Sequence, residues 1–133
     1  KGAREAYERV FQRYPLFTPA HKPLALLLSD RLNEPAAAHE QATKARTAFP
    51  NDPEVARLLG RLSYQRGEFS RAAQLLLESA ASFPSDGELF HQLGIAQFRM
   101  KQRESKATLT KALALAPDSP LAPESRRLLS ELK

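Results

Sequence analysis

The sequence predicts an all-α protein made of repeated helix pairs, and two observations support this prediction. Apolar residues recur three and four positions apart along most of the chain, which is the spacing of one face of a helix. Prolines end successive segments at Pro15, Pro50, Pro84 and Pro117, and the intervals between them are nearly equal. The near-constant interval indicates that one structural unit recurs along the chain.

A shift of the sequence that moves Pro50 onto Pro84 tests the repeat directly. The same shift superimposes six further pairs of identical residues: Ala38 on Ala72, Phe49 on Phe83, Asp52 on Asp86, Glu54 on Glu88, Leu59 on Leu93 and Gly60 on Gly94. The one-residue differences between the proline intervals belong in turns, where insertions cost little. The sequence therefore predicts a helical array with a period of about 34 residues.

Length and composition restrict the class of protein. The chain has 133 residues, of which 42% are hydrophobic and 26% are charged, so it predicts one globular domain. It contains no cysteine, which excludes disulfides and thiolate metal sites. No apolar run approaches the roughly 20 residues that span a bilayer, and the net charge of +5 slightly favours acidic partners. Because the chain begins with Lys1 and not with Met, we expect a segment of a longer protein.

The first two units are the least regular. Residues 1–15 predict the second helix of a truncated repeat, which ends at Pro15. Residues 19–52 predict repeat 1, with a leucine-rich first helix, a turn at 33–35 and an alanine-rich second helix. Pro19 suits a helix start, whereas Pro23 fits a helix only in its first turn.

The later units are more regular. Residues 53–86 predict repeat 2, residues 87–119 predict repeat 3, and residues 122–133 predict one amphipathic helix that covers the open end of the array. Asn51 with Glu54 fits a capping box at the start of repeat 2, and Asp52 is the alternative cap. The turn within repeat 2 contains glycine, whereas the corresponding turn in repeat 3 does not.

These residues resemble the tetratricopeptide repeat of bacterial proteins, whose pattern is Trp-x2-Leu-Gly-x2-Tyr, then Ala-x3-Phe, then Ala and Pro. The positions that match are Leu59, Gly60, Ala72, Leu76 and Pro84 in repeat 2, Phe90, Leu93, Gly94, Leu109, Ala112 and Pro117 in repeat 3, and Ala38, Ala42, Ala45 and Pro50 in repeat 1. Ala56 and Ser63 depart from the pattern in place of Trp and Tyr. The resemblance implies a right-handed α–α superhelix, a solenoid of about three helix-turn-helix units with an extra helix at each end.

Two glycines lie in the middle of predicted helices. Gly60 and Gly94 each cost about 1 kcal/mol relative to alanine at such positions. This cost is tolerable where a helix must approach its neighbour closely. We therefore predict close helix crossings at both glycines, with the small residue Ala72 facing Gly60.

The resemblance also implies where a partner binds. In tetratricopeptide arrays the first helices line a concave groove, at fixed places after each repeat start. This rule gives the candidate peptide-binding residues Arg31, Arg57, Arg61, Tyr64, Gln65, His91, Ile95, Phe98 and Arg99. Because arginine binds carboxylates bidentately and aromatic side chains act as anchors, the set favours an acidic peptide or protein. The alternative interpretation is a solvated helix face with ordinary Arg–Glu pairs.

Two known binding modes fit the sequence poorly. The family variant that grips a C-terminal carboxylate needs Lys, Asn, Asn, Lys and Arg. The residues at those places are Pro23, Leu27, Leu58, His91 and Ile95. Nucleic-acid contact at the basic run of Lys101, Arg103, Lys106 and Lys111 is less favoured than a solvated turn, because no aromatic residues lie between the basic ones.

No catalytic chemistry is predicted. The three histidines His21, His39 and His91 are far apart and lack an accompanying carboxylate cluster, and no phosphate-binding glycine loop is present. We expect a non-catalytic scaffold for protein partners, with no cofactor, metal, small-molecule substrate or membrane insertion. The alternatives are an accessory domain of a larger enzyme or envelope-assembly protein, and, less favoured, an RNA-binding helical array. The sequence is compatible with cytoplasm and periplasm, and indicates no oligomeric state.

Overall fold

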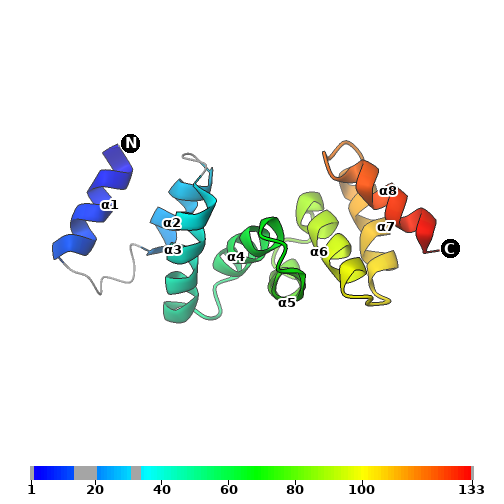
Figure 1. The fold of residues 1–133 in the computed structure, drawn as a ribbon, viewed down its shortest axis with the longest axis horizontal. Helices are drawn as coiled ribbons and strands as arrows, with labels where there is room; N and C mark the ends of the chain where they lie inside the picture. The colour runs from blue at the N-terminus through cyan, green and yellow to red at the C-terminus, as the bar shows by residue number, and fades with distance from the viewer. Residues whose placement is uncertain (1, 14–20, 31–33, 133) are drawn as a thin grey trace.

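The computed structural model describes residues 2–13, 21–30 and 34–132. These residues form eight helices and no strand: α1 (Gly2–Arg13), α2 (His21–Asp30), α3 (Pro35–Ala48), α4 (Pro53–Gln65), α5 (Phe69–Ala80), α6 (Gly87–Arg99), α7 (Ser105–Leu115) and α8 (Ala122–Glu131). The helices follow one another along the long axis of the molecule (Figure 1). The predicted all-α helical array is therefore confirmed.

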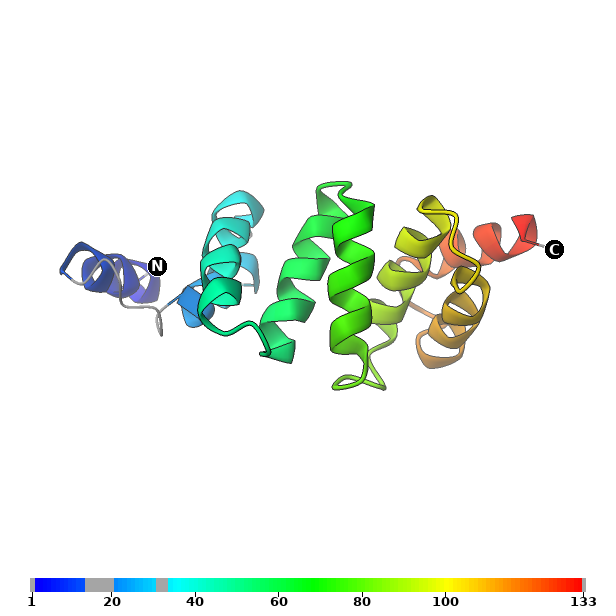
Figure 2. The ribbon, with the colours of Figure 1, turned by 90° about the horizontal axis from the view of Figure 1, so that it is seen from below.

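The helices pack as consecutive hairpins. Helix α2 packs on α3, α4 on α5, and α6 on α7. In Figure 2 the green helices α4 and α5 lie side by side at the centre of the molecule. The last two units begin with a helix that contacts both members of the preceding hairpin, since α6 contacts α4 and α5, and α8 contacts α6 and α7. Helix α8 thus takes the place of the first helix of a further unit.

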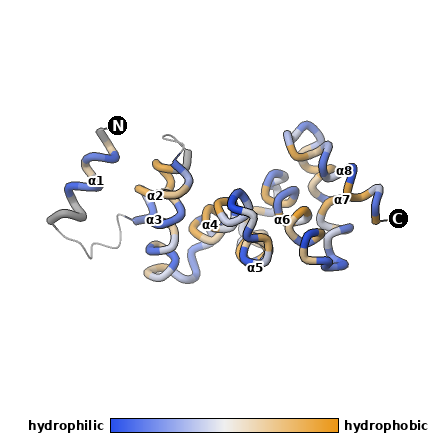
Figure 3. The backbone as a smooth tube through the Cα atoms, viewed as in Figure 1, coloured by the Kyte–Doolittle hydropathy of each residue, from blue (hydrophilic) through white to orange (hydrophobic). Residues whose placement is uncertain are grey.

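Among the residues that the structure describes, the core from α2 to α8 consists of three groups of buried apolar side chains. The first group joins α2, α3, α4 and α5, the second joins α5, α6 and α7, and the third joins α6, α7 and α8. Figure 3 shows hydrophobic and hydrophilic stretches alternating along the helices. Each helix pair therefore buries its apolar surface against the next pair, as expected of a repeat array.

Aspartates cap the first helices of two units. The Asp52 side chain accepts hydrogen bonds from the backbone N–H groups of Glu54 and Val55, so Asp52 and not Asn51 is the cap of α4. Asp86 accepts in the same way from the N–H of Leu89 at the start of α6. These bonds satisfy donors that have no partner within the helix.

The same two aspartates also tie each unit to the one before it. Lys22 of α2 donates to the second carboxylate oxygen of Asp52 at 2.8 Å. Arg57 of α4 donates to the second oxygen of Asp86 at 3.0 Å, and its guanidinium lies 3.8 Å from the centre of the Phe83 ring. One aspartate thus holds a helix start with one oxygen and a neighbouring helix with the other.

We predict that Asp86→Ala lowers the free energy of unfolding by about 1–2 kcal/mol, because it removes the cap of α6 and the partner of Arg57. Urea denaturation followed by circular dichroism measures the change. Asp118→Ala is the matched control, because Asp118 is exposed and lies outside the helices. Its effect should stay within about 0.5 kcal/mol. Equal effects of the two substitutions would contradict the dual role of Asp86.

The helices cross closely at Gly60 and Gly94, as predicted, but the residue that faces Gly60 differs from the prediction. A Cβ atom at Gly60 would lie 2.9 Å from Leu76 Cγ and 3.2 Å from Leu75 Cβ, so leucines face Gly60 and the predicted contact with Ala72 is wrong. At Gly94 a Cβ would lie 2.7 Å from Leu109 Cδ2 and 3.1 Å from the Leu109 backbone nitrogen. The absence of a side chain therefore makes room for a large leucine, not for a second small residue.

Candidate protein-binding face

The first helices of successive units place three apolar side chains in a row. Tyr64 of α4, Phe98 of α6 and Leu132 at the end of α8 occupy the same place in successive periods, and each is half-buried. All three pack against the buried group of Ile95, Leu109 and Leu128. We define the first-helix face by this row and its neighbours: Arg61, Tyr64, Gln65, Phe98, Arg99 and Leu132.

Aromatic and charged groups meet around Tyr64. Its ring packs edge-on against Phe69 with 5.8 Å between ring centres, and the Arg99 guanidinium lies 5.8 Å from the Phe69 ring centre. Arg99 also forms an ion pair with Glu124 of α8 at 3.6 Å. Burial, followed by the nearby Glu124 carboxylate, raises the pKa of the Tyr64 hydroxyl. A tyrosine hydroxyl is already protonated near pH 7 at its ordinary pKa, so Tyr64 can donate a hydrogen bond.

Helix α8 covers two of the residues that the sequence places in the groove. His91 is fully buried, with Nδ1 2.6 Å from the Ser125 hydroxyl oxygen and Nε2 donating to the carbonyl oxygen of Ala116 at 2.9 Å. Ile95 is 2% exposed and packs with Leu128 of α8. Both side chains thus contact the chain's own last helix, because α8 packs on α6 as a further first helix would.

The remaining predicted residues divide into three groups. Arg61, Tyr64, Gln65, Phe98 and Arg99 belong to the first-helix face. Arg57 is engaged by Asp86 and Phe83, so its charge is used within the fold. Arg31 lies outside the described residues. The five residues of the first group remain the candidate binding set.

The structure adds Phe69, Glu124 and Leu132 to the surroundings of this set. A signal for Leu132 was present in the sequence, because one further step of the same period from Phe98 reaches it. No comparable signal in the sequence indicated Phe69 of α5 or Glu124 of α8. The contacts of Phe69 and Glu124 with Arg99 depend on the angles at which α5 and α8 cross α6. The spacing of residues in the sequence does not predict these angles.

The turn between α6 and α7 contains a residue in the left-handed region. Lys101 has φ 59°, and Gly67 has φ 78° in the corresponding turn between α4 and α5. A residue with a side chain pays a steric cost in this conformation that glycine does not. The sequence therefore has a lysine at a position where glycine would fit the backbone better.

We predict that Lys101→Gly raises the free energy of unfolding by about 1 kcal/mol, because it relieves this backbone cost. Thermal melting together with urea denaturation measures the change. The control Lys44→Gly, in the middle of α3, should lower stability by about 1 kcal/mol because glycine is unfavourable inside a helix. Destabilisation by Lys101→Gly would show that the lysine side chain itself supports the turn.

Two general features of the described residues bear on function. Among the described residues, no group of three or more His, Asp or Glu side chains is arranged to hold a metal ion. None of the helices in this part of the chain is long and apolar enough to cross a membrane.

Successive helix hairpins that pack one after another, with half-buried side chains in a row on their first helices, are typical of a helical repeat protein. The chain belongs to the tetratricopeptide repeat family, because the family model "Tetratricopeptide repeat" matches residues 31–97. A comparison with curated protein sequences gives no significant match.

Several solved structures are similar to this chain. A MamA protein is 21% identical, with 98% of this chain and 75% of that chain covered and a TM-score of 0.73. YrrB, a TPR protein with an unusual peptide-binding site, is 20% identical, with 93% of this chain and 64% of that chain covered and a TM-score of 0.72. The first TPR of Spaghetti (RPAP3) bound to an HSP90 peptide is 20% identical, with 86% and 92% covered and a TM-score of 0.67. At these identities the similarity shows the fold, which is the predicted right-handed solenoid.

Proposed function

We propose that the chain is a non-catalytic scaffold that binds a peptide or partner protein on the first-helix face. The observation that supports this most is the row of Tyr64, Phe98 and Leu132, which stays half-exposed although it lies beside the core. Half-exposed aromatic side chains next to arginines are typical of interaction anchors. Two of the similar structures, YrrB and the Spaghetti domain, have peptide sites.

An acidic partner fits the charges of this face best. Arg61 lies one helical turn before Tyr64 and Arg99 directly follows Phe98, and the pair of Arg99 with Glu124 is partly exposed and long at 3.6 Å. A partly exposed ion pair of this length contributes little to stability, so a carboxylate of a partner can replace Glu124 beside Arg99 at low cost. Arg57 is not part of the proposal, since its substitution would also break the contact with Asp86.

The test compares two matched double substitutions. Arg61→Glu with Gln65→Glu changes the first-helix face on α4, and Arg71→Glu with Gln74→Glu makes the same chemical change on the exposed side of α5. The immobilised chain captures partners from a lysate of the source organism, with mass spectrometry as the readout and thermal melting as the check of folding. Partners should be retained by the α5 variant and lost by the α4 variant. Retention of the same partners by both variants would contradict the proposal.

A further inference from the structure

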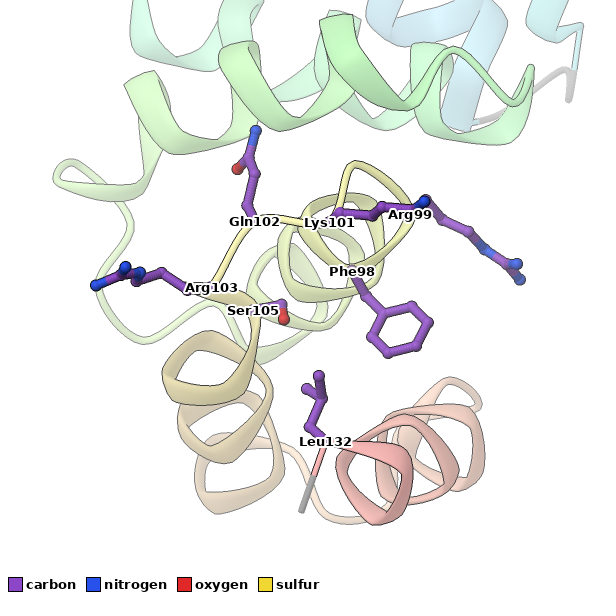
Figure 4. Close-up of a pocket in the computed structure, with 7 residues that line it drawn as sticks. All are labelled: Phe98, Arg99, Lys101, Gln102, Arg103, Ser105 and Leu132. Carbon is purple, nitrogen blue, oxygen red and sulfur yellow. The ribbon is translucent and has the colours of Figure 1, made fainter.

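A pocket of about 490 Å³ opens at the turn between α6 and α7. Phe98 and Leu132 form its apolar part, and Figure 4 shows these two side chains pointing toward each other. The cations Arg99, Lys101 and Arg103 stand around it, and the Arg99 and Arg103 side chains extend to opposite sides (Figure 4). Gln102 also lines the pocket, but its side chain points away from Phe98 (Figure 4).

The pocket lies at a place where α7 begins about one helical turn later than α5 does. Leu76 of α5 faces Gly60 and Leu109 of α7 faces Gly94, so the two leucines occupy equivalent places. Helix α5 begins seven residues before its leucine, at Phe69, whereas α7 begins four residues before its leucine. Counted from these leucines, the position of Phe69 is taken by Gln102, which lies in the turn before α7, and residues 101–105 (Lys-Gln-Arg-Glu-Ser) contain no aromatic residue.

In the preceding unit, Phe69 shows that the equivalent position holds an aromatic ring. Its ring packs against the edge of Tyr64 and lies under the guanidinium of Arg99, at 5.8 Å in each case. Phe98 stands one repeat period after Tyr64, and it lines the pocket from the equivalent position. An aromatic ring from outside the chain would meet in this pocket an aromatic side chain and cations, as Phe69 does in the preceding unit.

The charge around the pocket is concentrated and largely unpaired. Residues 99–111 contain five cationic side chains and one glutamate, so their net charge is +4, whereas the net charge of the whole chain is +5. Within the described part of the chain, Lys101, Arg103 and Lys106 form no ion pair. Arg103 also borders a second shallow hollow on α7 with Lys106 and Lys111, so the positive surface continues beyond the pocket.

The backbone conformation of Lys101 supports a role in binding for the positive charge around the pocket. Lys101 holds the left-handed conformation that Gly67 holds in the preceding turn, although glycine would fit it at lower cost. Backbone strain of this kind is concentrated at functional positions. A lysine at such a position, beside an apolar pocket, is placed to bind an anion.

We infer that this pocket binds an aromatic side chain of an acidic peptide, with the flanking carboxylates on Arg99, Lys101 and Arg103. The inference rests on the proposed function and specifies the class of partner. Carboxylates on either side of the aromatic residue complement the three cations, and the ring fills the place that Phe69 fills one unit earlier.

The test uses fluorescence anisotropy with the full chain and three labelled peptides. The first peptide has one phenylalanine with two aspartates on each side, the second replaces the phenylalanine with alanine, and the third replaces the aspartates with asparagines. We expect the first peptide to bind, and the second to bind at least about tenfold more weakly because the anchor is lost. The third should also bind about tenfold more weakly or worse, because several charge-assisted contacts are lost together.

Lys101→Gly is the most informative variant, because it should weaken binding of the first peptide about two- to fivefold while raising the melting temperature. A loss of binding by this variant therefore cannot come from unfolding. Leu132→Glu, which places a negative charge in the pocket, should abolish binding, and Arg71→Ala on α5 should leave it unchanged.

The inference is overturned if the first peptide fails to bind, or if it binds Lys101→Gly and Leu132→Glu as it binds the unmodified chain. Tighter binding of a single-stranded uridine-rich RNA than of the peptide, lost in the same variants, would assign the surface to nucleic acid instead. Self-association in sedimentation experiments that only the pocket variants prevent would assign it to a second copy. If peptide binding fails while the α4 variant still loses its captured partners, the proposed function stands without this inference.

Discussion

Removal of residues 122–133 is expected to lower the free energy of unfolding by about 3 kcal/mol or more, because α8 buries the last hairpin. Without α8, His91 loses Ser125, and Ile95 loses the cover of Leu128. The shortened chain should also aggregate as its concentration rises, because apolar surface on α6 and α7 becomes exposed. Urea denaturation measures the stability, and light scattering measures the aggregation.

A point substitution separates the covering role of α8 from a general effect of truncation. Leu128 is 1% exposed, and Leu128→Ala should cost about 2–5 kcal/mol. Leu77→Ala is the same chemical change on α5, where the side chain is 61% exposed, so it should cost less than about 0.5 kcal/mol. Similar melting of the two variants would show that α8 does not cover the array.

The sequence predicted the parts of the fold that depend on backbone chemistry. Asp86 was recognisable as a helix start, because a cap needs a short acceptor side chain at one position. The prolines and Gly94 marked the period for similar reasons, since each residue type has a narrow set of backbone uses. The regular spacing of such residues could therefore be converted directly into helix hairpins.

The contacts between helices were predicted less well, because they depend on side-chain volume and on where each helix begins. Gly60 was expected to face Ala72, but the helix crossing places Leu76 there. The positions predicted for the groove assume that the side chains on each first helix are accessible to a partner. In the structure α8 covers two of them, His91 and Ile95. The pocket beside Phe98 lies at the late start of α7, and the spacing between prolines does not show where a helix begins within a unit.

The crossing of α6 and α7 is expected to tolerate almost no added volume, so Gly94→Val should cost about 3 kcal/mol or more. A Cβ at this position would lie 2.7 Å from Leu109 Cδ2, 2.8 Å from Leu109 Cγ and 3.1 Å from the Leu109 backbone nitrogen. The leucine side chain can change rotamer, but the backbone nitrogen can move only if α7 shifts. Urea denaturation measures the cost, and Arg71→Val on the exposed side of α5 should cost less than about 1 kcal/mol.

Gly94→Ala tests the sign of the effect. In an open helix this substitution would stabilise by about 1 kcal/mol through helix propensity alone, so a net loss would show that the crossing is closed. The double variant Gly94→Val with Leu109→Ala should cost less than the sum of the two single variants, because the alanine vacates the space that the valine needs. Additive costs would mean that the backbone contact, and not the leucine side chain, sets the distance between α6 and α7.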